Sequence, residues 1–227
     1  MKKYPTSIGA LLLIVAFISS ARSEEKPTQE RLDQVVAKIQ IAYEKIGDLR
    51  CDFTQTVRFQ DFETPYLSKG RLFLKKGKMR WDYQEPSRQQ IFVDGERVLY
   101  YIPEHKQIIK SRLGGESDSH LPLRLLAGTG RLDQSFQISF EGEASPSQKS
   151  ISLRLIPKNG GTQLTHIIAT VAPSPSVEGL IIQKVVLYEE NGNVSLFSFE
   201  GIEINKGLSE DVFNFKIPKG IEIIESP

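Results

Sequence analysis

The sequence predicts a mainly β protein in which one antiparallel sheet curls over a small number of helices. Three observations lead to this prediction. Short runs of alternating apolar and polar residues follow one another from residue 51 almost to the C-terminus, glycine-containing turns separate several of them, and one long stretch has helical periodicity. Because twist accumulates across many strands, such a sheet is expected to curl and leave a hollow side that helices can cover.

The long helical pattern covers residues 28–47. Thr28 is available as the N-cap, Gly47 ends the pattern, and charged residues lie opposite the apolar ones. The apolar residues recur at steps of three and four: Leu32, Val35, Val36, Ile39, Tyr43 and Ile46. This spacing predicts an amphipathic helix with one face against the sheet.

The period changes to two after the helix. In the first predicted strand the residues on one face are Cys51, Phe53, Gln55, Val57 and Phe59. Further strands are predicted at residues 67–74, 78–84, 89–93, 97–102, 106–110, 134–141, 149–156, 164–171, 180–188 and 193–204. Hairpin turns are expected at Gly77, Asp94-Gly95 and Asn191-Gly192.

The remaining segments are short. The apolar stretch 121–127 predicts a short helix, and 208–212 predicts a single helical turn. Residues 213–217 and 220–224 are expected to form two short terminal strands. The chain has no internal repeat or low-complexity linker, so residues 24–227 are expected to form a single domain.

The N-terminus has the pattern of a secretory signal peptide. Lys2 and Lys3 precede an apolar run, and the small residues Ala21 and Ser23 follow it, so cleavage is expected after Ser23. The apolar run is shorter than the roughly 20 residues of a membrane span, although an uncleaved anchor is the alternative. We therefore expect residues 1–23 to be a signal peptide and the mature protein to be periplasmic.

Composition argues against several classes of function. The chain has 29 basic and 28 acidic residues; without Lys2, Lys3 and Arg22 the balance is 26 to 28, a net charge of −2, which does not fit nucleic-acid binding. The single cysteine, Cys51, is expected to be a small buried hydrophobe. The three histidines are scattered, and neither a nucleotide-binding loop nor a catalytic motif is present, so no enzyme activity, cofactor or metal site is predicted.

The stretch KMRWDYQEP, residues 78–86, places Met79, Trp81 and Tyr83 on one face of a strand. Large apolar residues in this arrangement either fill a core or line a space that is kept open for an apolar ligand. The residue pattern by itself leaves both interpretations open.

Several motifs, taken in order, resemble those of the outer-membrane lipoprotein carrier family, the LolA-like periplasmic carriers. The matching residues are Phe53-Thr54-Gln55, Gly70-x-Leu72-x-Leu74, Met79-Arg80-Trp81-Asp82-Tyr83 with Pro86, Asp94-Gly95-x-x-Val98-x-x-Tyr101-x-Pro103, Pro122-x-x-Leu125-Leu126-Ala127-Gly128 and Phe213-x-Phe215-x-x-Pro218-x-Gly220-Ile221. The resemblance implies an incomplete (half) antiparallel β-barrel of about 11 strands, covered by a helical lid. It also implies a monomer that takes acylated lipoproteins from an inner-membrane ABC-type exporter and delivers them to an outer-membrane lipoprotein receptor.

The resemblance also implies which residues line the acyl-chain cavity. Carried over residue by residue, they are Met79, Trp81, Tyr83, Tyr43 and Leu49, and alternation adds Phe53, Ile91 and Leu99. The family's lid-holding arginine and proline are replaced here by Lys75-Lys76-Gly77. Lys76 is the best match for lid control, and because an ammonium lacks the planar fork of a guanidinium, we expect a looser lid or one held by another residue.

Four other functions remain open at this point. They are a lipoprotein receptor of the same fold, a sensor domain that detects lipoproteins, an unrelated lipid binder, and a secreted hydrolase. The receptor would need a lipidated cysteine after its signal peptide, and none is present. The identity of a bound ligand would separate the carrier from the others.

Overall fold

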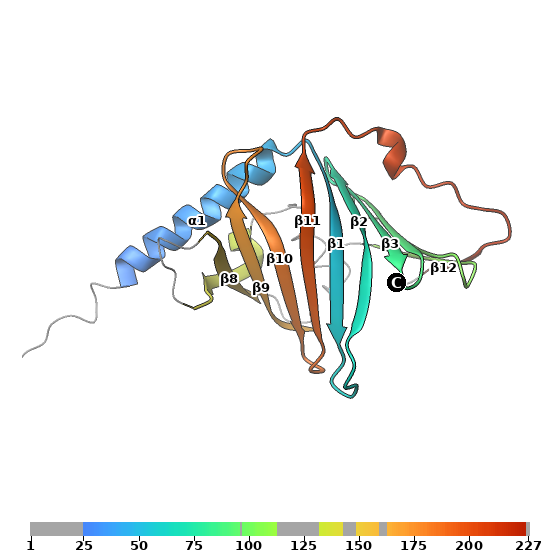
Figure 1. The fold of residues 1–227 in the computed structure, drawn as a ribbon, viewed down its shortest axis with the longest axis horizontal. Helices are drawn as coiled ribbons and strands as arrows, with labels where there is room; N and C mark the ends of the chain where they lie inside the picture. The colour runs from blue at the N-terminus through green and yellow to red at the C-terminus, as the bar shows by residue number, and fades with distance from the viewer. Residues whose placement is uncertain (1–24, 96, 113–131, 143–148, 159–162, 226–227) are drawn as a thin grey trace, which may run out of the picture.

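The computed structural model describes residues 25–95, 97–112, 132–142, 149–158 and 163–225. The helical elements are α1 (Glu25–Lys45), α3 (Leu132–Ser135) and the 3-10 turn η1 (Glu210–Phe213). The strands are β1 (Asp48–Arg58), β2 (Tyr66–Lys75), β3 (Lys78–Glu85), β4 (Gln89–Asp94), β5 (Arg97–Ile102), β6 (Gln107–Arg112), β7 (Phe136–Phe140), β8 (Ile151–Pro157), β9 (Leu164–Pro173), β10 (Leu180–Glu189), β11 (Val194–Ile204) and β12 (Glu222–Glu225). Figure 1 shows their arrangement.

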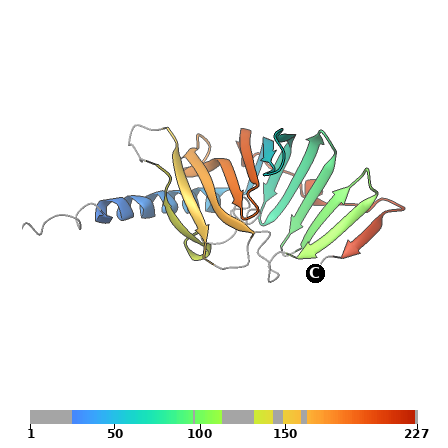
Figure 2. The same ribbon diagram turned by 90° about the horizontal axis from the view of Figure 1, so that it is seen from below.

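All twelve strands belong to one open sheet in the order β12-β6-β5-β4-β3-β2-β1-β11-β10-β9-β8-β7. Neighbours are antiparallel, except that β12 pairs with β6 in parallel. Figure 2 shows that the sheet curls and does not lie flat. The predicted mainly β fold with an unclosed sheet is therefore confirmed, with one strand more than the expected 11 or so.

Helix α1 covers one half of the sheet. Its buried residues Leu32, Val35, Ile39 and Ala42 follow the predicted three- and four-residue steps. Figure 1 places α1 beside β8–β10, away from β3 and β12. Gly179, at the start of β10, allows close contact, because a Cβ there would lie 2.3 Å from the Lys38 carbonyl oxygen. The helix begins at Glu25, so the prediction that Thr28 is its N-cap is wrong.

The face of the sheet against α1, called the inner face here, carries matched rows of apolar side chains. In one row Leu49 pairs with Leu74, Leu74 pairs with Met79, and Met79 pairs with Val93. In the next row Leu72 pairs with Trp81, and Trp81 pairs with Ile91. Register thus aligns the alternating residues of four strands on one side, which builds a continuous core.

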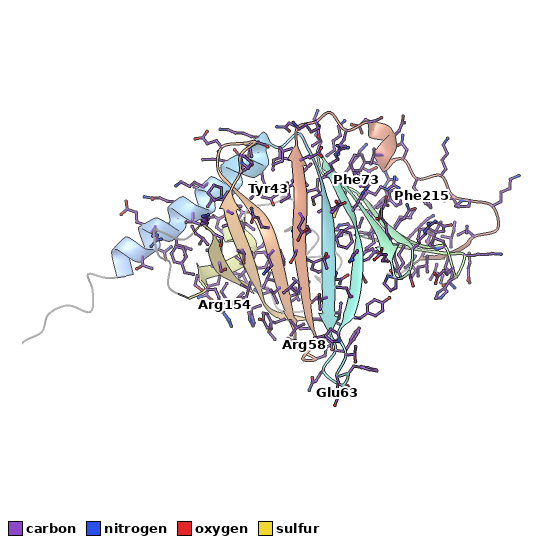
Figure 3. All side chains as sticks on the ribbon, in the orientation of Figure 1. Tyr43, Arg58, Glu63, Phe73, Arg154 and Phe215 are labelled. Atoms are coloured by element: carbon purple, nitrogen blue, oxygen red, sulfur yellow. The ribbon has the colours of Figure 1, made fainter. Side chains whose placement is uncertain are left out.

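The segment after β11, called the C-terminal strap here (residues 205–221), crosses the opposite, outer face. Figures 1 and 3 show it leading from β11 past η1 toward β12. The predicted strand 213–217 does not form; instead the Phe215 ring packs on Phe92 and Tyr101, at 4.9 and 5.2 Å between ring centroids. Burial of that ring replaces strand pairing as the interaction that holds the segment.

The predictions for residues 1–23 and for the short helix at 121–127 lie outside the described residues. None of the helices in the described part of the chain is both long and apolar enough to span a membrane. The hairpin turns are confirmed at Gly77, Gly95 and Gly192, which all have the positive φ angles that glycine tolerates.

Candidate functional site

Three predicted cavity residues form a packed floor in the middle of the inner face. Met79 and Trp81 are each 1% exposed, and Phe53 is 2% exposed. The Trp81 ring meets Phe53 edge-on, at 4.8 Å between centroids, and its indole nitrogen donates to the Met79 sulfur at 2.6 Å. Phe197 and Phe199 of β11 complete this aromatic cluster. In the present conformation these side chains are buried and pack against one another.

Leu49 and Tyr43 lie at the edge of this floor, where α1 leads into β1. Leu49 is 5% exposed and belongs to the core. Tyr43 packs against the same core from α1, and Figure 3 shows it on that helix near the start of β1. Burial raises the pKa of the Tyr43 phenol, although a backbone hydrogen bond from Ile182 opposes the effect. The phenol is therefore uncharged at physiological pH.

An open groove of about 510 Å³ begins where the floor ends, and it is called the inner groove here. Tyr83 and Ile91, two of the predicted residues, line it. Other apolar residues of its walls, which sequence reasoning did not assign to the site, are Val57, Phe59, Tyr66, Val98, Tyr100 and Ile109. Its volume lies in the range of about 300–1,000 Å³ that is typical of small-ligand sites.

The described lining of the inner groove contains no charged side chain. Its polar groups are neutral amides and hydroxyls, and two of them satisfy each other, since the Tyr100 hydroxyl donates to Gln89 Oε1 at 2.5 Å. Burial raises the pKa of Tyr83, so this phenol also stays neutral. A groove of this kind suits an uncharged, apolar ligand.

Leu99 does not share a face with the other predicted residues. Across the β4–β5 hairpin Leu99 pairs with Phe92, whereas Ile91 pairs with Tyr100. Because side chains alternate along a strand, Leu99 lies on the outer face, and its assignment to the same cavity lining as Ile91 is corrected. It lines a different groove, of about 650 Å³, beneath the C-terminal strap. The walls of this outer groove include the charged residues Asp94, Arg97, Lys110 and Arg112.

Lys76 lies in the β2–β3 turn with a positive φ of 42° and is exposed. Within the described residues its side chain makes no hydrogen bond or ion pair; its neighbours Lys75 and Lys78 instead bind the C-terminal strap, each with Glu210 at 3.1 Å. The predicted short helix at 121–127, one of the helices expected to cover the sheet, is outside the described residues, so the role of Lys76 in lid control stays a prediction.

Within the part of the chain that the structure describes, no three His, Cys, Asp or Glu residues gather in a way that could hold a metal ion. Cys51 is buried on β1, as predicted, and burial raises the pKa of its thiol to about 12. The inner groove therefore remains the candidate site, and its chemistry is that of apolar binding.

Comparison with known proteins identifies the family of this chain. The family described as outer membrane lipoprotein carrier protein LolA matches residues 44–216, which is most of the chain. The chain belongs to this family. The matched residues include the last turn of α1, the strands β1 to β11, and the part of the C-terminal strap that contains Phe215.

Relatives of this carrier-family protein support the assignment along most of its length. An outer-membrane lipoprotein carrier protein from Hahella chejuensis is 30% identical over 179 residues, which cover 78% of this chain and 81% of the relative. A protein of the same name from Nitrosospira multiformis is 28% identical, covering 80% and 84% of the two chains. The family predicted from the sequence motifs is thus confirmed.

Among solved structures, a DUF1329 family protein from Desulfovibrio piger is similar in fold to this carrier-family protein. The TM-score is 0.51 with 11% sequence identity, and the alignment covers 83% of this chain and 97% of the other. At this identity the likeness concerns the fold alone.

Proposed function

We propose that the protein is a periplasmic carrier of acylated lipoproteins, and that their acyl chains bind in the inner groove. The observation that carries this proposal is the uncharged, largely apolar lining of that groove in a member of the lipoprotein carrier family. Curated relatives from Hahella chejuensis and Nitrosospira multiformis bear the name of outer-membrane lipoprotein carrier. The cargo would arrive from an inner-membrane ABC-type exporter and leave to an outer-membrane lipoprotein receptor.

The free energy of transfer explains why a carrier is needed. Each acyl CH₂ removed from water contributes about 0.8 kcal/mol, so a chain of roughly sixteen carbons gains about 12 kcal/mol from full burial. A lipoprotein with such chains would not leave a membrane for water without a protein to cover them. The carrier must also release the cargo, so its affinity has to depend on conformation.

The packed floor gives this conformational dependence a physical basis. Phe53 and Trp81 already contact each other in the free protein, whereas the inner groove beside them is open. We infer that an acyl chain first occupies the groove and that separation of the floor aromatics makes room for more of the cargo. On this proposal Met79, Trp81, Phe53, Leu49 and Tyr43 line the expanded cavity.

Residues 1–23 are proposed to direct export and to be removed after Ser23. N-terminal sequencing of the protein recovered from the periplasm tests this. A mature chain that starts at Glu24 agrees with the proposal, and a chain that keeps the apolar run would indicate an anchor instead.

The proposed function is tested with one variant on each face of the same hairpin. Ile91 and Leu99 are both partly buried aliphatic residues, on β4 and β5, but Ile91 lines the inner groove and Leu99 the outer one. Purification of the wild-type protein from periplasm under mild conditions should yield a complex with an acylated lipoprotein, identified by mass spectrometry. Ile91→Glu should lose the cargo because a carboxylate cannot be buried beside an acyl chain; Leu99→Glu should keep it.

The outcomes separate the proposed function from its alternatives. Free phospholipid in place of lipoprotein would indicate a general lipid binder. Loss of cargo in Leu99→Glu but not in Ile91→Glu, with unchanged circular dichroism and melting, would place the binding site elsewhere than on the inner face.

A further inference from the structure

The tip of the β1–β2 hairpin exposes large apolar side chains at one end of the inner groove. Phe62 is 68% exposed, Tyr66 is 45% and Phe59 is 40%. In Figure 3 the labelled residues Arg58 and Glu63 mark this tip at the lower end of the two strands. Exposed apolar residues that cluster in this way indicate an interaction site.

The tip and the inner groove form one continuous apolar surface. Phe59 and Tyr66 are exposed at the tip and at the same time line the groove. The Phe62 ring meets Phe59 edge-on, at 6.0 Å between centroids, and extends the surface beyond the groove. Toward the other end, Val98 is only 5% exposed. The groove thus has a solvent-exposed end at the tip and a buried end near β5.

The tip has a fixed conformation. The Gln60 backbone N–H donates to Asn193 Oδ1 at 3.1 Å, and this contact joins the β1–β2 tip to the β10–β11 turn. At Gly192 in that turn, a Cβ would lie 2.1 Å from Gln60 Oε1, so the two turns are in direct contact. The Phe62 N–H also donates to the Phe59 carbonyl at 3.3 Å. The two rings are therefore presented in a set geometry, which lowers the entropic cost of binding.

Charge helps to decide what binds there. The tip carries the carboxylates of Asp61 and Glu63 and the guanidinium of Arg58, a net charge of −1. An anionic membrane surface attracts basic segments, so this tip is a poor fit to one. The apolar surface continues into a groove that would hold an acyl chain, and the polypeptide attached to such a chain is too large to follow it. The end of the acyl chain that is attached to the polypeptide must therefore stay at the solvent-exposed end of the groove.

We propose that the β1–β2 tip is the mouth of the inner groove, where Phe59 and Phe62 contact the part of an acyl chain nearest its point of attachment. The far end of the chain points toward Ile91 and Tyr100. This inference rests on the proposed function, because it assigns a direction to the ligand in the groove. It names Phe62 as a binding residue that is exposed in the free protein.

The test uses two photoreactive palmitate probes on the purified full-length mature protein. One probe carries a diazirine near the carboxyl group, and the other carries it near the terminal methyl group. After irradiation, peptide mass spectrometry should find the first probe on residues 59–66 and the second on peptides that contain Ile91 or Tyr100. Labelling in the reverse order, or first-probe labelling away from the tip, would overturn the proposal.

Affinity gives a second readout. Phe62→Ser should weaken palmitate binding roughly three- to tenfold, since part of the chain loses its cover. Ile217→Ser is the matched control, because Ile217 is 48% exposed but lies on the C-terminal strap. The palmitate affinity of this variant should equal that of the wild type. Equal affinity in Phe62→Ser and the wild type would overturn the role of the tip.

The result also separates this inference from the proposed function. Suppose that palmitate binds saturably and that Ile91→Glu blocks binding, but that the tip is not labelled and Phe62→Ser keeps wild-type affinity. The inner groove is then still the binding site, and its mouth lies elsewhere. If palmitate does not bind the wild type, both proposals fail. If Phe62→Ser abolishes binding to phosphatidylglycerol vesicles without changing palmitate affinity, the tip contacts a bilayer, and the proposal is wrong.

Discussion

Gly70 controls how closely β2 and Phe53 approach each other. A Cβ at this position would lie 2.1 Å from the Asp82 carbonyl oxygen and 2.8 Å from two carbons of the Phe53 ring. The absent side chain therefore allows the Phe53 ring to lie over the strand, where it meets Trp81 and Tyr83 edge-on. The floor of the site depends on that space more than on glycine's backbone freedom.

Gly70→Ala is expected to destabilise the protein by about 2 kcal/mol or more, because the added methyl group clashes with backbone and with a packed ring. Chemical denaturation monitored by the fluorescence of Trp81, the one tryptophan of the chain, measures the change in free energy of unfolding. Gly95→Ala is the control: its Cβ would meet nothing within 4 Å, and its positive φ alone should cost about 1–2 kcal/mol. Equal losses in the two variants would contradict the packing argument.

Cys51 provides a probe of the same region. It is 5% exposed, and burial raises the pKa of its thiol to about 12, so almost none of it is thiolate at pH 8. We expect iodoacetamide to modify Cys51 slowly in the native protein and rapidly in denaturant, as followed by mass spectrometry. Complete modification of the native protein within minutes would mean that β1 opens from the core far more often than this packing implies.

Alternation along one strand could be predicted from the sequence, whereas the face on which the next strand begins could not be predicted from alternation alone. Met79, Trp81 and Tyr83 share the inner face as predicted. Leu99 was assigned to the wrong face because the parity between β4 and β5 depends on the turn. Asp94 pairs with Arg97, which leaves two residues in the turn and puts Leu99 opposite Phe92. A two-residue hairpin centred on Asp94-Gly95 would have put Leu99 opposite Gln90, which is on the correct face but in a different register.

Among the elements, the C-terminal strap depends on cations from the β2–β3 hairpin. Lys75 and Lys78 each lie 3.1 Å from a Glu210 carboxylate oxygen, and Lys75 also donates to the Leu208 carbonyl. Arg80 donates to the Val212 carbonyl at 2.7 Å while its guanidinium lies over the Phe92 ring. These contacts hold the strap on the outer face, opposite the inner groove.

Acid is expected to loosen the strap. Hydrogen bonds from Lys78 and then Lys75 lower the pKa of Glu210 below its ordinary value of 4.5. Because the folded pKa is the lower one, the contribution of this carboxylate is present above pH 4.5 and is lost as pH falls through the folded value. Hydrogen exchange of residues 205–217 should therefore speed up at low pH relative to the intrinsic rate, and high salt should reduce the difference.

Glu210→Gln is the control for this effect, since it removes the titrating group. The strap of this variant should exchange faster at neutral pH and show a smaller dependence on pH. A wild-type strap whose protection does not change between pH 6 and pH 3 would contradict the assignment to Glu210.

The sequence did not allow us to predict which distant strand the terminal elements pair with. The residues of β12 form a parallel pair with β6, more than 100 positions earlier in the chain, in which Ile223 lies opposite Ile108. Residues 213–217 alternate like a strand, but the outer face offers Phe92 and Tyr101 as a surface for Phe215, and ring packing prevails there. A short apolar run does not specify whether it will pair with a neighbouring strand or pack its side chains on a surface.

At the scale of the whole molecule, the two halves of one sheet have different roles. The half from β7 to β10 is covered by α1, whose buried residues belong to the hydrophobic core. The half from β2 to β6 carries the inner groove on one face and the C-terminal strap on the other. A covered half gives the sheet its stability, so the other half can keep an apolar surface available for a ligand.

This division predicts how ligand binding affects stability. An acyl ligand that binds the folded state alone, at about 100 times its dissociation constant, adds about 2.7 kcal/mol, which corresponds to a rise in Tm of roughly 5–10 °C for a protein of this size. Palmitate should therefore stabilise the wild type and Leu99→Glu in a thermal melt, and it should leave Ile91→Glu unchanged. Because the groove already lies open beside Trp81, the first ligand should bind without bringing the indole into water, and the emission maximum should stay at short wavelength. A shift to longer wavelength on binding would mean that the floor of Phe53 and Trp81 separates at this step, so that the groove and the expanded cavity fill together.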